Sequence, residues 1–162
     1  KTRTIDVTCD LRASDGEAVF GDTKKGSFAI RVAPTLRLKG EVAKGHITNS
    51  EGVTDGEAWG KRAKWVAFHG PDSAGTATVV AIFDHATNLR HPTWWHARDY
   101  GLLTANPFGP RAYGDTEFKG TGDFTLKNGE SLKQRYRLVL HQGDLASAKL
   151  EEQWKAFSRQ AE

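Results

Sequence analysis

The sequence contains no methionine, only one cysteine and no long apolar run. Because even the initiator residue is absent, we expect either a processed mature form or a fragment of a longer protein. The single Cys9 excludes a disulfide within the chain, and its place among alternating apolar residues favours a buried, unreactive thiol. Without about 18 consecutive apolar residues, no segment is expected to span a membrane, and we predict no membrane partner.

Several catalytic signatures are also missing. The chain has no glycine-rich phosphate loop, no G-x-S-x-G, no H-E-x-x-H and no C-x-x-C, so nucleotide-binding, serine-hydrolase and zincin functions have no support. The net charge of +3 is spread along the chain, and only Lys24-Lys25 and Lys61-Arg62 are adjacent basic pairs. Since nucleic-acid binders cluster their basic residues on one face, no nucleic-acid partner is predicted.

Alternation of apolar and polar residues with a period of two dominates the chain. The pattern covers residues 5–11, 28–32 and 132–140 and predicts half-buried strands, whereas the continuous apolar run at 79–83 predicts a strand covered on both faces. Glycine-rich breaks between these runs favour antiparallel strands with short connections. Among them, Asn128-Gly129 predicts a hairpin with a type I′ turn.

One helix is predicted at the C-terminus, where Asp144 can cap it. Its apolar stripe consists of Ala146, Leu150, Trp154 and Phe157. Glu151 and Lys155 are spaced for an i,i+4 ion pair on another face. We therefore predict an all-β fold, an antiparallel β-sandwich closed by one C-terminal helix, forming a single domain over residues 1–162.

The densest polar and aromatic stretch is RHPTWWHARDYGLLTANPFGP, residues 90–110. If it is a strand, His96, Arg98 and Tyr100 project to one face, where they could supply a proton shuttle, an anion clamp and a hydroxyl donor. A hydrogen-bonded network on a sheet face would give the same pattern, so both interpretations stay open. Asp99 falls on the other face, where a structural ion pair with Arg31 or Arg62 is expected.

Three further groups of residues are candidates for a site. Asp84, His85 and His91 follow the buried strand, and loops at strand ends often carry function. The spacing of His85, His91 and His96 matches no compact zinc pattern, but convergence in space leaves a divalent metal open. The loop with Asp22 and Lys24 could reach a ligand or form a solvated turn. Trp59, Trp94 and Trp95 could stack on sugar rings or pack in the core.

Four segments resemble the PmoA-like family of uncharacterised bacterial proteins, also classed as a domain of unknown function, DUF6807. These segments are FGDTKKGSFAIRVAPTLR, GHITNSEGVTDGEAWGKRAKWVAFHG, AIFDHATNLRHPTWWHARDYGLLTANPFG and RYRLVLHQGD. The resemblance is to the second half of family members only, because nothing here matches the histidine-rich DHPHHRG of their first half. The missing N-terminal half is therefore a possible partner. The sequence departs from the family at Lys25, where an acidic residue is usual.

The resemblance implies a sugar-related role. Members occur beside carbohydrate oxidoreductases and hydrolases, their fold is similar to mutarotase-like sandwiches, and a periplasmic or secreted location is favoured. The family name refers to a methane monooxygenase subunit, an integral membrane protein, and with no spanning segment here methane oxidation is not expected. The leading hypothesis is a carbohydrate-active enzyme of hydrolase, lyase or epimerase type, and the alternative is a non-catalytic glycan-binding or assembly module.

The expected site follows from the residues and from the resemblance together. The predicted catalytic residues are His96, Arg98, Tyr100 and His91. The predicted contacts to a carbohydrate ligand are Asp22, Lys24, Arg31, His85, Trp94, Trp95 and Asn106. The matching positions Asp84 and Asp99 are further candidates, and no cofactor is assigned beyond the divalent metal left open above.

Overall fold

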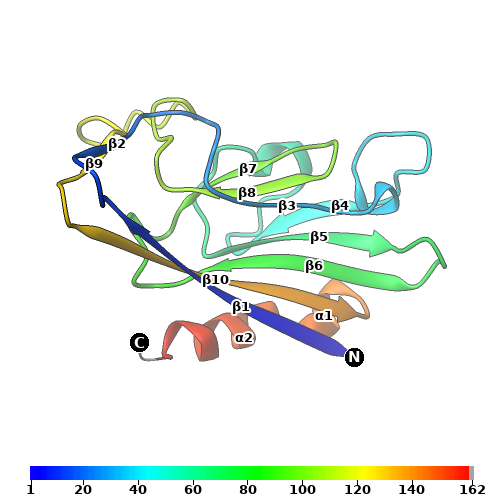
Figure 1. The fold of residues 1–162 in the computed structure, drawn as a ribbon. Helices are drawn as coiled ribbons and strands as arrows, with labels where there is room; N and C mark the ends of the chain where they lie inside the picture. The colour runs from blue at the N-terminus through cyan, green and yellow to red at the C-terminus, as the bar shows by residue number, and fades with distance from the viewer. Residues whose placement is uncertain (161–162) are drawn as a thin grey trace.

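A five-stranded antiparallel sheet underlies the fold in the computed structural model, which describes residues 1–160 (Figure 1). The elements in chain order are β1 (Thr2–Arg12), β2 (Ala18–Phe20), β3 (Phe28–Arg31), the 3₁₀ turn η1 (Pro34–Leu36), β4 (His46–Asn49), the 3₁₀ turn η2 (Asp55–Ala58), β5 (Trp65–Pro71), β6 (Ala77–Asp84), β7 (Trp94–Ala97), β8 (Leu102–Asn106), β9 (Phe124–Leu126), β10 (Ser131–Gln142), α1 (Leu145–Ala148) and α2 (Leu150–Ser158).

The strands form two layers and a small accessory sheet. The large sheet has the order β1-β10-β6-β5-β4, and a three-stranded sheet with the order β3-β8-β7 packs on one of its faces. The helices α1 and α2 cover the other face, while β2 and β9 pair at one end of the molecule (Figure 1). The predicted fold class, an antiparallel β-sandwich with a C-terminal helix, is confirmed.

The central strand β6 shows why the layers form in this way. Its side chains alternate between two cores: Ile82 packs with Phe68 and Trp95 between the sheets, whereas Phe83 packs with Phe157 beneath the helix. Each of these residues is fully or almost fully buried. The continuous apolar run therefore lies in a strand covered on both faces, as predicted. Successive side chains point to opposite faces, so they are all buried only if both faces are covered.

The C-terminal helical segment follows the predicted pattern with one interruption. The Oδ1 atom of Asp144 accepts a hydrogen bond from the Ser147 backbone N–H at 2.8 Å, which caps α1. Lys149 then adopts a left-handed conformation with φ of 48°, so the segment is divided into α1 and α2 rather than being one continuous helix. The predicted Glu151–Lys155 pair forms at 3.9 Å, and Glu151 also binds Lys64 at 2.9 Å.

The prediction of a type I′ hairpin at Asn128-Gly129 is wrong. Asn128-Gly129 does form a turn, closed by the Glu130 N–H donating to the Lys127 carbonyl at 2.9 Å, and Gly129 has φ of 87°. Because φ is positive at only one central position and the turn joins β9 to β10, which lie in different sheets, it is neither a type I′ turn nor a hairpin.

Cys9 lies on β1 and is only partly buried, so the expected buried position is wrong. The strand forms the edge of the large sheet, and its apolar row stays partly open, with Ile5 50% exposed and Leu11 38% exposed. The neighbouring strand β10 is covered, since Tyr136 stacks on Phe28 of the upper sheet with ring centroids 4.6 Å apart. The upper sheet thus covers β10 but leaves the edge strand incompletely covered. Among residues 1–160, no helix is long and apolar enough to cross a membrane.

Candidate functional site

The outer face of the three-stranded sheet carries a hollow of about 480 Å³, a volume within the range of small-molecule sites. It is lined by Lys24, Lys25, Gly26, Ser27, Ala29, His96, Arg98, Tyr100, Leu102 and Thr104. Alternation along the strands explains this set. Ala97 and Leu103 point inward and are buried, so His96 and Thr104 point to the outer face.

The predicted trio of His96, Arg98 and Tyr100 therefore lines one hollow, but for a different reason from the one expected. The segment is a hairpin of β7 and β8 rather than a single strand. The Arg98 N–H donates to the Leu102 carbonyl at 2.8 Å, and the Gly101 N–H donates to the Arg98 carbonyl at 2.9 Å. Gly101 has φ of 89°, which the tight turn requires, and the turn places Arg98 and Tyr100 at the mouth of the hollow.

His96 is held in one tautomer by Trp59. The indole Nε1–H of Trp59 donates to Nδ1 of His96 at 3.0 Å, and an indole nitrogen can only donate. The hydrogen of the neutral imidazole is therefore on Nε2. Burial lowers the pKa of His96, and the positive charges of Arg98 and Lys24 lower it further, so the ring is neutral at pH 7.

The guanidinium of Arg98 carries unused hydrogen-bonding capacity. Its Nε is buried and has no hydrogen-bond partner within residues 1–160. Its Cζ lies 5.7 Å from the centroid of the Tyr100 ring, and the Cζ of Arg31 lies 5.5 Å from the same centroid. Arg31 thus stands beside Tyr100 rather than among the residues that line the hollow.

The loop that carries Lys24 is fixed from below by two buried residues. Asn106 donates from Nδ2 to the Thr23 carbonyl at 2.7 Å, and the Tyr113 hydroxyl donates to the Lys24 carbonyl at 3.1 Å. Burial raises the pKa of Tyr113 to about 12, so this hydroxyl keeps its hydrogen. Asn106 is fully buried and its amide holds the loop in place, so its predicted substrate contact stays a prediction outside the residues that line the hollow.

The carboxylate of Asp22 binds backbone N–H groups. Its carboxylate accepts hydrogen bonds from the N–H groups of Arg111 at 3.3 Å, Ala112 at 3.2 Å and Gly122 at 3.0 Å. These contacts anchor the 110–122 segment to the Lys24 loop. The predicted substrate contact of Asp22 stays a prediction; in the structure its carboxylate binds the backbone of this segment, and Asp22 is not among the residues that line the hollow.

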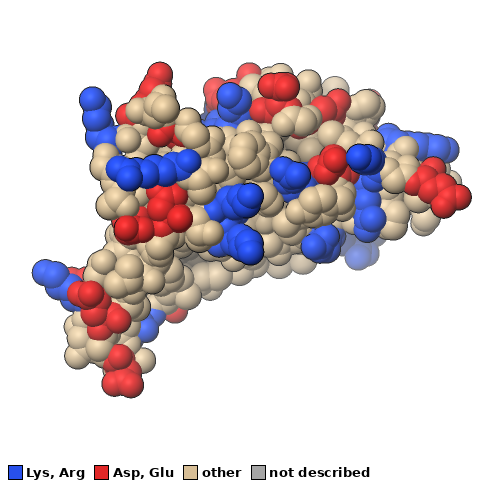
Figure 2. Space-filling view, turned by 90° about the horizontal axis from the view of Figure 1, so that it is seen from above, with Lys and Arg blue, Asp and Glu red and all other residues tan. Residues whose placement is uncertain are grey.

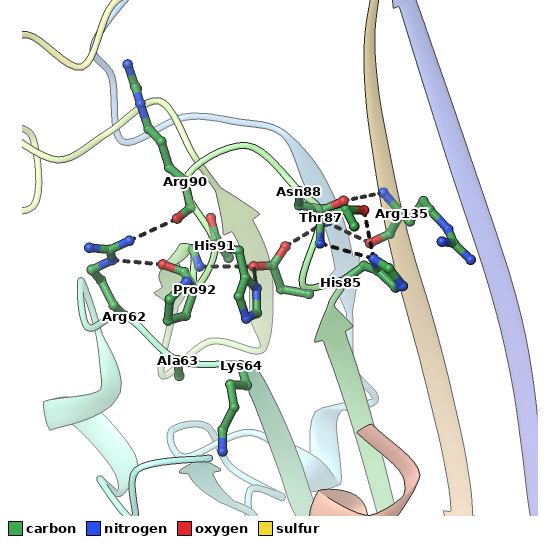
Figure 3. Close-up of polar contacts among 12 residues, drawn as sticks. Arg62, Ala63, Lys64, His85, Thr87, Asn88, Arg90, His91, Pro92 and Arg135 are labelled. Atoms are coloured by element: carbon green, nitrogen blue, oxygen red, sulfur yellow. Dashed lines mark hydrogen bonds and ion pairs between the residues drawn. The ribbon is translucent and has the colours of Figure 1, made fainter. Parts of the chain in front are cut away.

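His91 belongs to a separate polar cluster at the end of β6 (Figure 3). Its Nδ1 lies 2.6 Å from Oδ2 of Asp84, which also accepts from the Thr93 N–H at 3.1 Å. Nδ2 of Asn88 donates to the other carboxylate oxygen at 2.6 Å. The His91 ring stacks on Trp154 of α2 at 5.7 Å, so this cluster fastens the helix to the sheets.

The surroundings of His91 differ from those of His96. In Figure 3, Arg62 reaches the backbone of the same loop, donating to the Pro92 carbonyl at 2.8 Å and the Arg90 carbonyl at 3.0 Å. The hollow beside His96 is not lined by His91. The structure therefore does not bring the two predicted catalytic histidines into one site.

His85 is 1% exposed and packs edge-on against Phe157 with centroids 5.0 Å apart. Its Nδ1 accepts the Thr87 N–H at 3.2 Å. His85 is not among the residues that line the hollow, so its predicted substrate contact stays a prediction without support from its position. Within residues 1–160, no group of three His, Cys, Asp or Glu side chains is arranged to hold a metal ion, so the three predicted histidines do not converge.

Trp94 and Trp95 are both 0% exposed, so of the two interpretations left open in the sequence the structure agrees with packing inside the protein. Trp95 points into the core and donates from Nε1 to the Ala63 carbonyl at 2.8 Å. Trp94 points outward but is covered, since Phe118 packs edge-on against it and Nε1 donates to Asp115 at 2.9 Å. The 110–122 segment therefore closes this part of the outer face.

Asp99 lies in the hairpin turn, where its carbonyl accepts the N–H groups of Leu38 at 3.0 Å and Lys39 at 3.2 Å. The ion pairs found within residues 1–160 do not include it, so the expected pair with Arg31 or Arg62 is wrong.

Sequence reasoning missed the role of Trp59 in orienting His96 and the contributions of Ser27, Lys25 and Thr104 to the hollow. Thr104 could have been found from the alternation once β8 was separated from β7, because it lies opposite His96. Trp59 follows η2, 37 residues before its partner, and nothing local in the sequence marks that contact.

Comparison with known proteins identifies a family, but the function of that family is not known. No curated protein and no solved structure matches the chain. Residues 1–155 match the model of DUF6807, which is described as a family of unknown function. Since this match covers nearly all of the chain, the protein belongs to the DUF6807 family.

Proposed function

We propose that the protein is carbohydrate-active and that its ligand occupies the hollow lined by His96, Arg98 and Tyr100. The observation that carries this proposal is the gathering of three chemically different groups around one accessible space of about 480 Å³. An imidazole, a guanidinium and a phenol together can donate to, clamp and exchange protons with a hydroxyl-rich ligand. The sugar-related setting implied by the PmoA-like resemblance supports a carbohydrate as that ligand.

The tautomer of His96 defines the chemistry that this residue offers. With Nδ1 accepting from Trp59, His96 presents Nε2–H and acts first as a hydrogen-bond donor to a sugar oxygen. To act as a base through Nε2, the ring must first move its hydrogen to Nδ1 and lose the Trp59 bond. Tyr100, which is 40% exposed, is the remaining group of the trio that can pass a proton. In a balanced step, His96 with its hydrogen moved to Nδ1 takes a proton from the substrate at Nε2, and the Tyr100 hydroxyl gives one back. The imidazolium then returns its proton to the Tyr100 oxygen.

The set of lining residues narrows the reaction types. Most glycosidases use a pair of carboxyl groups, and none of the residues within 1–160 that line this hollow is Asp or Glu. The arrangement therefore favours elimination or epimerisation over hydrolysis with paired carboxylates. The same observation supports the second candidate, a non-catalytic glycan-binding module, since binding needs only donors, a cation and an apolar surface.

The test is turnover and binding with a panel of glycosides and 3-keto-sugars, with and without divalent metal. We expect turnover that His96→Asn abolishes while the exposed His46→Asn keeps it, with far-UV circular dichroism confirming that both variants fold. Binding without turnover, weakened in His96→Asn, would support the glycan-binding module instead. If no sugar of the panel is bound or turned over, the proposal is wrong.

We also propose that a further part of the PmoA-like domain, corresponding to its N-terminal half, packs beside β1. The support is the half-exposed apolar row of this edge strand, including Ile5 and Leu11. Hydrogen exchange tests the idea: backbone amides of Thr2–Arg12 should exchange more slowly when a polypeptide with the sequence of that N-terminal half is added than in this chain alone. Equal exchange in both would exclude the contact.

A further inference from the structure

The groups around the hollow are of one charge sign. Lys24, Lys25 and Arg98 line it, and Arg31 stands beside Tyr100 at its mouth. Figure 2 shows the molecule from the side of the three-stranded sheet, with several Lys and Arg side chains across the middle of this face. The field at the hollow is therefore positive, and the cations Arg98 and Lys24 help to keep His96 uncharged.

Arg98 is the most informative of these cations. Lys24 and Lys25 are exposed and solvated, but Nε of Arg98 is buried and lacks a hydrogen-bond partner within residues 1–160. A buried donor without a partner is costly, and a planar guanidinium satisfies its donors best by binding a carboxylate through two parallel hydrogen bonds. The terminal N–H groups of Arg98 are not among the buried atoms and form no hydrogen bond or ion pair within residues 1–160, so they remain available to a carboxylate in the hollow that this side chain lines.

The rest of the hollow offers neutral donors and a small apolar surface. His96 presents Nε2–H, Ser27 and Thr104 supply hydroxyls, and Leu102 and the Tyr100 ring supply apolar area. Ser27 is already oriented, because its hydroxyl donates to the Ala105 carbonyl at 3.2 Å. Neutral donors and acceptors of this kind suit the hydroxyls of a sugar ring.

We infer that the ligand of this hollow is an acidic sugar, a uronate-type carbohydrate whose carboxylate binds Arg98 while its ring hydroxyls meet His96, Ser27 and Thr104. This inference rests on the proposed function and names the substrate class of the same site. A carboxylate on the sugar also activates the neighbouring C–H toward loss of a proton, which agrees with the elimination or epimerisation favoured above.

Isothermal titration calorimetry with matched sugar pairs tests the inference. The pairs are methyl glucuronide with methyl glucoside and methyl galacturonide with methyl galactoside, each at low salt, with sodium acetate as an anion that lacks a sugar ring. We expect at least one uronide to bind about tenfold or more tightly than its neutral partner. Arg98→Gln should remove this preference, Arg98→Lys should retain part of it, and the exposed Arg12→Gln should leave it unchanged.

The possible failures are distinguishable. If neutral and acidic partners bind equally and Arg98→Gln has no effect, the acidic-sugar inference is wrong while the proposed sugar site stands. If acetate competes as well as the uronides, the hollow is a plain anion site, and both proposals are wrong. If neither member of either pair binds at about 50 mM, where even a Kd of several millimolar gives a signal, both are wrong as well.

Discussion

Nε1 of Trp59 lies 3.0 Å from Nδ1 of His96 and donates a hydrogen bond to it, although the two residues are 37 positions apart in the chain. The rings are also in edge contact, with centroids 6.3 Å apart and an interplanar angle of 66°. Because an indole cannot accept, this contact fixes which nitrogen of His96 carries the hydrogen. Trp59 is therefore a positioning residue, and its role can be tested apart from catalysis.

Trp59→Phe should let His96 populate both neutral tautomers, because the phenyl ring has no donor for Nδ1. We expect the ¹⁵N shifts of the two ring nitrogens to move toward each other and the affinity for a bound sugar to fall about three- to tenfold. The matched control is Trp65→Phe, which removes an indole bonded to Glu151 on the helix side. Unchanged His96 shifts in Trp59→Phe would contradict the assignment.

Stability should fall as the pH drops from about 7.5 to about 5.5, because burial lowers the pKa of His69, His85 and His96 in the folded chain. The unfolded chain, with ordinary values near 6.5, takes up these protons first, so it binds more protons in this window and is favoured by acidification. Urea unfolding at several pH values measures the slope. His96→Gln should flatten it, and a wild-type slope in that variant would contradict the prediction.

Asp84→Asn should destabilise the fold by about 3 kcal/mol, because the carboxylate is 1% exposed and accepts bonds from Asn88, His91 and Thr93. An amide at this position turns one acceptor into a donor facing other donors. Denaturant unfolding measures the loss, and the exposed Asp10→Asn should stay within about 0.5 kcal/mol of wild type. A comparably small loss for Asp84→Asn would mean that the cluster does not fasten the helix.

Phe157→Ala should cost about 3–4 kcal/mol, since the ring is 1% exposed in the core between α2 and the large sheet. The exposed Lys155→Ala on the same helix provides the control, with little change expected beyond its weak pair with Glu151. Thermal unfolding followed by circular dichroism compares the two variants. If Phe157→Ala unfolds like the control, α2 is not part of the cooperative core.

Tyr113→Phe should loosen the Lys24 loop, because the hydroxyl that donates to the Lys24 carbonyl is lost, at a cost of about 1 kcal/mol. Hydrogen exchange should become faster at residues 23–25, and sugar affinity should fall modestly. Ser158→Ala is the control, since it also removes a hydroxyl that donates to a backbone carbonyl, that of Lys155 on the C-terminal helix, at 3.2 Å. Equal exchange at the loop in both variants would show that Tyr113 does not hold it.

The layers of the fold could be predicted because the continuous apolar run of β6 and the alternation of β10 both report which faces of the strands are buried. The error at Cys9 arose because alternation shows that a face is apolar but not that another layer covers it. The hairpin of β7 and β8 escaped detection since residues 94–106 alternate without a strong turn signal other than Gly101. The even-numbered residues face outward on both strands, as His96 does on β7 and Thr104 on β8. The turn around Gly101 therefore does not interrupt the alternation and cannot be seen in it.

The lining residues of the hollow could be predicted where their side chains face outward from the sheet. Residues whose side chains hold other parts of the fold in place could not be told apart from them. His96, Arg98 and Tyr100 were found because their spacing survives the turn. Asp22, Asn106 and Trp94 look like ligand contacts in the sequence, but each is used by backbone or ring partners about 20 to 100 residues away along the chain. Such contacts depend on tertiary packing, which residue type and local spacing do not encode.

The most direct test of the central claim is a titration of the ¹⁵N-labelled protein with methyl glucuronide and methyl glucoside, followed by amide chemical shifts. If the hollow is the functional site, the shifts that change should lie at residues 24–29 and 96–104, which surround it. Changes confined to β1 or α2, or no changes with either sugar, would contradict the account.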